Sequence, residues 1–157
     1  MAQDYEKTLS DIKKYVTGYQ PKYFNTAVQG YKVVEWSLED KVGFINWLFD
    51  KDFSIWPDYL LYYETIGAVL RNKPKPALAK EDIVRFCGVY ENHLEFFDAS
   101  SVIEFVNIAM PKKHDEDIDN ALKNLLKAIE NKEHVFPQRA KKKDKLVEKM
   151  KSYLTDK

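Results

Sequence analysis

Hydrophobic residues recur at steps of three and four along most of the chain, which is the spacing of one face of an α-helix. The first such stripe runs through residues 5–19, and Gly18 and Pro21 are expected to end that helix. A second helix is predicted from Ser37, whose side chain can cap it, to about Asp50. Acidic residues in its first turn and a hydrophobic stripe behind them support this prediction.

Proline residues divide the middle of the chain. Pro57 suits the first turn of a helix, because its missing N–H would be unpaired there in any case, and hydrophobic positions continue at helical spacing to Leu70. Pro74 and Pro76 then predict an extended linker over residues 72–77, because each proline fixes φ and disfavours helix in the residue before it. This linker is the best candidate hinge in the chain.

The second half of the chain returns to the helical spacing. The clearest stripe contains Ile118, Leu122, Leu125 and Ile129 on one face, with lysines outside it. Four helices are predicted here, over residues 79–90, 98–110, 115–131 and 139–154.

Only three short segments have the composition of β-strands, namely residues 31–36, 94–97 and 135–136. A lone hairpin is marginal in water, so these segments are weak evidence for a sheet. We therefore expect an all-α fold, a compact array of about seven helices, with a mainly helical α+β fold containing one short hairpin as the alternative. Residues 1–137 would form the helical body, and residues 138–157 a basic amphipathic C-terminal helix of the same domain.

The composition narrows the class of protein. A chain of 157 residues, 45% of them hydrophobic, can bury a core without covalent or metal cross-links. Cys87 is the one cysteine, so no intramolecular disulfide can form, and the N-terminus is polar where a secretory signal would be hydrophobic. No hydrophobic run approaches the roughly 20 residues of a membrane-spanning helix. These features predict a cytoplasmic protein without a membrane span.

The formal net charge of zero hides an uneven distribution of charge. Residues 1–137 contain 17 Lys and Arg against 22 Asp and Glu, whereas residues 138–157 contain 8 against 3. The C-terminal segment is therefore expected either to pack against the acidic body or to bind an acidic partner.

Three aspartates raise the question of a metal site. Asp115, Asp117 and Asp119 alternate as in calcium-binding loops, but Asn120 stands where such a loop needs glycine, and Leu126 stands where it needs glutamate. Acids that complement the dipole at the start of the next helix explain them better. The three histidines lie in unrelated contexts, and the five glycines form no phosphate-binding loop. We expect no metal and no cofactor.

Catalysis has little support in the sequence. Cys87 and His93 are close enough to suggest a nucleophile and its base, but their spacing on a helix places them on different faces. Cys87 also lies in a hydrophobic stripe, where a thiol is usually an inert filler. An enzyme could still assemble its acids and bases from distant helices. The groups to inspect in that case are Glu64, Glu91, Glu95, Glu104 and His93. A non-enzymatic role is favoured, and an enzymatic one is left open.

Aromatic residues are concentrated between positions 36 and 63, in greater number than a small helix pair needs for its core. Core packing explains most of them, but those left near the surface would be typical of binding hot spots. The leading hypothesis is therefore a non-enzymatic helical interaction module, a small regulator, adaptor or inhibitor-like protein that binds a protein partner or a second copy of itself. The predicted binding residues are Trp47, Phe53, Trp56, Tyr59, Tyr62 and Tyr63.

The basic C-terminal segment supports an alternative function, association with nucleic acid. Its positive side chains could neutralise several phosphates and would give binding a steep salt dependence. A solvated helical face is the competing explanation, because the same segment carries a hydrophobic stripe that can pack against the body. The residues of this alternative site are Arg139, Lys141, Lys142, Lys143 and Lys145.

Overall fold

The computed structural model describes residues 3–55, 57–74, 78–94, 99–110, 114–131 and 140–155. Within these ranges the chain forms eight α-helices and one short 3-10 helix, and it contains no strand. The all-α class expected from the sequence is confirmed. The chain divides into two compact units, Met1–Ala77 and Leu78–Lys157, and the division falls at the end of the proline-containing segment 72–77.

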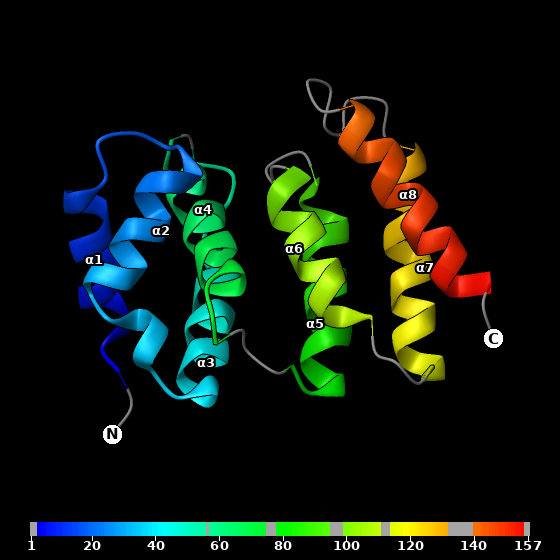
Figure 1. Ribbon diagram of the computed structural model, residues 1–157, viewed down its shortest axis with the longest axis horizontal. Helices are drawn as coiled ribbons and strands as arrows, with labels where there is room; N and C mark the ends of the chain where they lie inside the picture. The colour runs from blue at the N-terminus through cyan, green and yellow to red at the C-terminus, as the bar shows by residue number, and fades with distance from the viewer. Residues whose placement is uncertain are drawn as a thin grey trace. The chain divides into compact units, whose positions relative to one another are not determined.

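The first unit is built from four α-helices and the 3-10 helix η1, drawn in blue to green in Figure 1. The helix α4 packs against α2 and α3, and α1 packs against α2. Large buried side chains from all four helices form the core, among them Ile12, Phe24, Phe44, Leu48, Ile66 and Leu70. The elements are α1 (Tyr5–Tyr15), α2 (Pro21–Gly30), η1 (Val33–Glu35), α3 (Leu38–Phe49) and α4 (Asp58–Arg71).

The helix α2 was not foreseen from the sequence. Pro21 does not merely follow the first helix; it occupies the first turn of a second one, where the missing N–H costs no hydrogen bond. The chain then turns at Lys32, which has φ of 61° in the left-handed region, and enters η1. Residues 31–36, which had the composition of a strand, therefore form a turn and a 3-10 helix.

Side-chain caps fix the starts of α1 and α3. The Asp4 carboxylate accepts the backbone N–H of Lys7 at 3.0 Å. The Ser37 hydroxyl accepts the N–H of Asp40 at 3.1 Å, as its position in the sequence predicts. Pro57 lies at the N-cap position of α4, one residue before the first helical turn in which it was expected. Its missing N–H leaves no hydrogen bond of the helix unmade at that position.

The start of segment 72–77 is held by the first unit. The Lys41 ammonium donates a hydrogen bond to the Pro74 carbonyl at 2.8 Å, and its side chain is almost fully buried. The Asn72 amide donates to Asn25 Oδ1 at 3.1 Å. The remaining part of the predicted hinge, residues 75–77, lies outside the described residues.

The second unit contains α5 (Lys80–Asn92), α6 (Ala99–Ala109), α7 (Glu116–Asn131) and α8 (Ala140–Thr155) (Figure 1). The helix α7 packs against both α5 and α8, and α6 also contacts α8. Leu146, Met150 and Leu154 are buried, so the hydrophobic stripe of the C-terminal segment packs within this unit. Residues 95–97 and 135–136, from the other two strand-like segments, lie outside the described residues.

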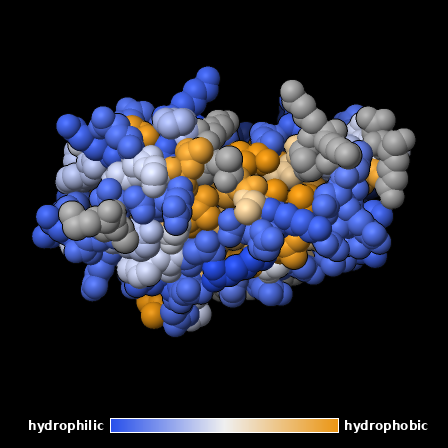
Figure 2. Space-filling model, turned by 90° about the horizontal axis from the view of Figure 1, so that it is seen from below, coloured by the Kyte–Doolittle hydropathy of each residue, from blue (hydrophilic) through white to orange (hydrophobic). Residues whose placement is uncertain are grey.

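The face drawn in Figure 2 is mainly hydrophilic, with hydrophobic residues exposed in patches. Across the described ranges, no helix combines the length and hydropathy that crossing a membrane requires.

Candidate binding surfaces

The aromatic residues predicted to bind a partner differ in how far they are exposed. Phe53 is only 2% exposed and belongs to the core. Trp47 is half-buried: its ring lies 6.1 Å from the ring of Phe44, and the Lys51 ammonium lies 3.8 Å from its centroid. Trp56 lies outside the described residues. Trp47 and the three tyrosines of α4 are equally half-buried, and we consider the tyrosines as a surface because they share one helix.

Two of these tyrosines form one face with a neighbouring isoleucine. The rings of Tyr59 and Tyr63 lie 6.2 Å apart, and both side chains are half-buried. Ile55 is 48% exposed. Its carbonyl accepts the N–H of Tyr59 at 3.0 Å, so the helical hydrogen-bond pattern of α4 extends back to Ile55. Ile55, Tyr59 and Tyr63 therefore follow one another at intervals of four residues. We refer to these three residues as the α4 face.

Tyr62 supports this face from the core side. Its ring meets Phe53 edge-on at 5.7 Å. Burial raises the pKa of the Tyr62 hydroxyl, and the nearby carboxylates of Asp58 and Asp52 raise it further. The phenol therefore stays protonated at neutral pH and is able to donate a hydrogen bond.

A second pair of exposed aromatic residues was missed from the sequence. Tyr15 and Tyr31 are 46% and 41% exposed, and their rings meet edge-on at 6.1 Å. Tyr15 lies beside the buried stripe of α1 rather than in it, which is the only signal that the sequence offers. Tyr31 follows α2, and that helix was not predicted.

The basic segment carries its charge on one exposed helix. Lys141, Lys142 and Lys145 are exposed on α8, and Lys143 is half-buried. Arg139, the fifth residue of the predicted nucleic-acid site, lies outside the described residues. The structure thus brings three of the predicted lysines to the surface of the second unit.

Two adjoining hollows lie between α6 and α8, with volumes of about 390 Å³ and about 480 Å³. Both are lined by Lys145 and Lys149, and we refer to the two neighbouring hollows together as the α6–α8 groove. Lys149 also donates a hydrogen bond to Asn107 across the groove. The other lining residues are Ile103, Glu104 and Met110 of α6 and its end, and Lys142, Leu146, Glu148, Ser152 and Tyr153 of α8.

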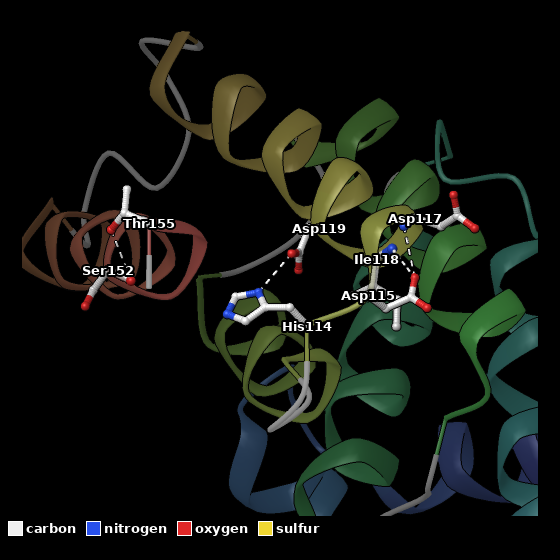
Figure 3. Close-up of polar contacts among 7 residues, drawn as sticks. All are labelled: His114, Asp115, Asp117, Ile118, Asp119, Ser152 and Thr155. Atoms are coloured by element: carbon white, nitrogen blue, oxygen red, sulfur yellow. Dashed lines mark hydrogen bonds and ion pairs between the residues drawn. The ribbon is translucent and has the colours of Figure 1, made fainter. Parts of the chain in front are cut away.

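The acidic residues at the start of α7 form a helix cap, drawn in Figure 3, and an ion pair with Lys80. Asp115 Oδ1 accepts the backbone N–H groups of Asp117 at 2.9 Å and Ile118 at 3.2 Å. The Lys80 ammonium lies 3.2 Å from Asp115 and 2.8 Å from Asp117. The hydrogen bond from Ile118 and the charge of Lys80 lower the pKa of the Asp115 carboxyl. These contacts tie the start of α5 to the start of α7.

His114 forms a second polar cluster beside this cap. Its Nδ1 lies 2.8 Å from Asp119 Oδ2, a contact marked by a dashed line in Figure 3, and Asp119 is only 5% exposed. The ring of Tyr153 stacks on the imidazole with centroids 4.3 Å apart. Burial and the neighbouring Asp119 raise the pKa of the Tyr153 hydroxyl. A carboxylate that orients an imidazole can serve catalysis, but here the cluster also joins α8 to the start of α7.

The remaining candidate groups belong to both units of the chain. Cys87 is 1% exposed, and burial raises the pKa of its thiol to about 12. Glu64 is buried in the first unit, His93, Glu91 and Glu104 belong to the second, and Glu95 lies outside the described residues. Within the described ranges, no group of three or more His, Cys, Asp or Glu side chains is arranged to hold a metal ion.

Comparison with known proteins finds no match for this chain among protein-family models, curated proteins or solved structures.

Proposed function

We propose that the chain is a non-enzymatic helical interaction module, a small regulator, adaptor or inhibitor-like protein, that binds a protein partner through the α4 face. One observation supports this proposal above the others. The contacting tyrosines Tyr59 and Tyr63 lie in line with Ile55, the most exposed large hydrophobic residue of the described chain.

Such a group suits protein recognition for physical reasons. A tyrosine offers a large hydrophobic contact area together with a hydroxyl that can bond a partner, and it loses little conformational freedom on binding. The contact between Tyr59 and Tyr63 restricts both rings before a partner arrives. Less entropy is then lost when the interface forms.

The position of the face on α4 adds rigidity. Leu61 is buried on the opposite side of the helix, and Ile66 and Leu70 continue the line of the face into the core of the first unit. Tyr62 rests on the buried Phe53 beside the face. A partner would therefore meet Tyr59 and Tyr63 on a fixed helix, with Ile55 just before its start.

The partner is a different protein or a second copy of the chain, and a reducing, cytoplasmic setting fits the single buried thiol. A nucleic acid is the second candidate partner, supported by the exposed row of Lys141, Lys142 and Lys145 on α8. The two candidates differ in salt dependence, because phosphate contacts release counterions and hydrophobic contacts do not.

The test is purification of the tagged full chain from its native lysate at low and moderate salt, with and without nuclease. The variant Tyr59→Ala combined with Tyr63→Ala is compared with Tyr15→Ala, which removes a more exposed tyrosine outside the face. Thermal unfolding of each variant confirms that the fold is retained. Light scattering of the pure protein measures self-association.

The proposal expects a stoichiometric protein, or a dimer, that survives nuclease, persists with Tyr15→Ala and is lost with the double variant. Equal loss with both variants contradicts the α4 face. Recovery of nucleic acid that disappears on raising salt supports the second candidate instead.

A further inference from the structure

We propose that the α6–α8 groove is a second binding site, which accepts an acidic amphipathic helix of a protein partner. The groove lies in the second unit, whereas the α4 face lies in the first. The two sites can therefore be tested by separate substitutions, and the failure of one does not imply the failure of the other.

The shape of the groove matches a helix. Ile103, Asn107 and Met110 recur at steps of four and three on the α6 side. Lys142, Lys145 and Lys149 recur at steps of three and four on the α8 side. Each set therefore forms one line along its own helix. From Lys142 to Tyr153 the α8 wall extends for roughly 16 Å, or about three helical turns. A groove of this length has room for the hydrophobic face of a partner helix, which is one recurring mode of peptide recognition.

The lysines of one wall and the hydrophobic floor of the groove indicate the chemistry of the partner. Lys142, Lys145 and Lys149 are exposed and line one wall. Ile103 and Leu146 provide a hydrophobic floor between the two helices. A helix that carries carboxylates along one edge and a leucine-type residue beside them would satisfy both features.

Two glutamates in the walls distinguish this partner from a nucleic acid. Glu104 lines one part of the groove and Glu148 the other. A phosphate backbone carries a negative charge at every nucleotide and would meet the exposed carboxylate of Glu148. A helix can place acids opposite the lysines and neutral or basic residues opposite the glutamates.

The Lys149–Asn107 hydrogen bond crosses the groove and must yield or be covered when a partner binds. Lys149 and Asn107 are exposed, so their bond contributes little to stability and its loss is a small obstacle. A carboxylate of the partner would replace the Asn107 oxygen as the acceptor of the Lys149 ammonium.

The experiment uses the full chain and three fluorescent probes. The first is a synthetic helical peptide of about 18 residues, roughly 27 Å as a helix, with glutamates at steps of three and four and leucines beside them. The second has the same composition in scrambled order. The third is a single-stranded DNA oligonucleotide. Binding is measured by fluorescence anisotropy at low and moderate salt.

Two variants that change the charge by the same amount show whether binding depends on the groove or on the rest of the basic surface. The groove variant is Lys142→Glu with Lys145→Glu. The control is Lys127→Glu with Lys141→Glu, which reverses two exposed lysines that do not line the groove. All four side chains are exposed, so both variants should fold, and thermal unfolding verifies this.

The proposal expects the patterned peptide to bind at least about tenfold more tightly than the scrambled one, a difference of about 1.4 kcal/mol. The groove variant should lose about tenfold or more in affinity, and the control less than about threefold. Absence of peptide binding, or an equal loss with both variants, would overturn the proposal. Preferential binding of the oligonucleotide would also overturn it and would indicate a nucleic-acid surface.

Discussion

The hydroxyl of Tyr5 lies over the backbone of Gly43, where a Cβ atom on that residue would be only 2.2 Å from the oxygen. The Tyr5 ring cannot easily move away, because it stacks on Phe44 at 5.5 Å and contacts Trp36 and Trp47. Gly43 thus allows α1 to approach α3 closely. The glycine serves packing between two helices rather than a turn.

We expect Gly43→Ala to destabilise the protein. In the interior of a helix this change would normally add up to about 1 kcal/mol of stability. Here the overlap with the Tyr5 hydroxyl should reverse the sign, lowering the free energy of unfolding by about 1–3 kcal/mol. Urea denaturation followed by circular dichroism measures the change.

Gly88 provides the matched control, because a Cβ atom there would meet nothing within 4 Å beyond its chain neighbours and the backbone of its own helix. Gly88→Ala should stabilise, and Tyr5→Phe should recover part of the loss caused by Gly43→Ala. Equal stabilisation by Gly43→Ala and Gly88→Ala would show that the contact is unimportant.

The sequence could predict most helices but not this contact. Regular hydrophobic spacing predicted α7, and Ile118, Leu122 and Ile129 of that helix are buried. The hydrophobic spacing did not predict α2, because Gly18 and Pro21 were interpreted only as the end of the first helix and not as the gap before a second one. Spacing reports which face of a helix is buried, but not which helix covers that face.

The same limit applies to the candidate sites. Aromatic density singled out the region around α4 but could not tell the buried Phe53 from the partly exposed Tyr59. The lysines of α8 were visible in the sequence as a charged run. Ile103 and Asn107, which face those lysines across the groove, were not identified, because only the fold brings α6 beside α8.

Burial of Lys41 leads to a second prediction. Lys41→Ala should lower the free energy of unfolding by about 1–3 kcal/mol, because it removes a buried stem and the hydrogen bond to the Pro74 carbonyl. Lys41→Met, which retains most of the stem, should cost less. Chemical denaturation measures both, and an equal loss would show that packing of the stem contributes nothing.

The pH dependence of stability tests the burial of Lys41. Burial lowers the pKa of Lys41 below its ordinary value of 10.5, so the unfolded chain binds more protons in the interval between the two values. The stability of the native sequence relative to Lys41→Met should therefore rise with pH through that interval. A constant difference would contradict the lowered pKa.

Cys87 should be inert in the folded protein. Its thiol pKa is raised from 9.0 to about 12, which lowers the thiolate fraction at pH 8 about a thousandfold. Iodoacetamide should therefore modify the folded chain far more slowly than the chain in guanidinium chloride, as followed by mass spectrometry. Similar rates in the two conditions would contradict burial of the thiol.

The raised pKa also affects stability at alkaline pH. The unfolded chain releases its thiol proton near pH 9.0, whereas the folded chain retains it to about pH 12. The unfolded state therefore binds fewer protons in this interval, and the contribution of Cys87 to stability is lost as pH rises through it. Cys87→Ala should show a weaker loss over the same range.

The cluster of His114, Asp119 and Tyr153 predicts local stability at the end of α8. Asp119→Ala removes the acceptor of the His114 ring nitrogen, and Tyr153→Ala removes the ring stacked on the imidazole. Each change should lower the free energy of unfolding by about 1–3 kcal/mol and speed hydrogen exchange in the last turns of α8. Ser152→Ala is the control, because this neighbouring side chain is exposed and should leave exchange unchanged. If Asp119→Ala accelerated exchange no more than Ser152→Ala does, the cluster would not anchor α8, and its histidine would merit examination as a chemical group.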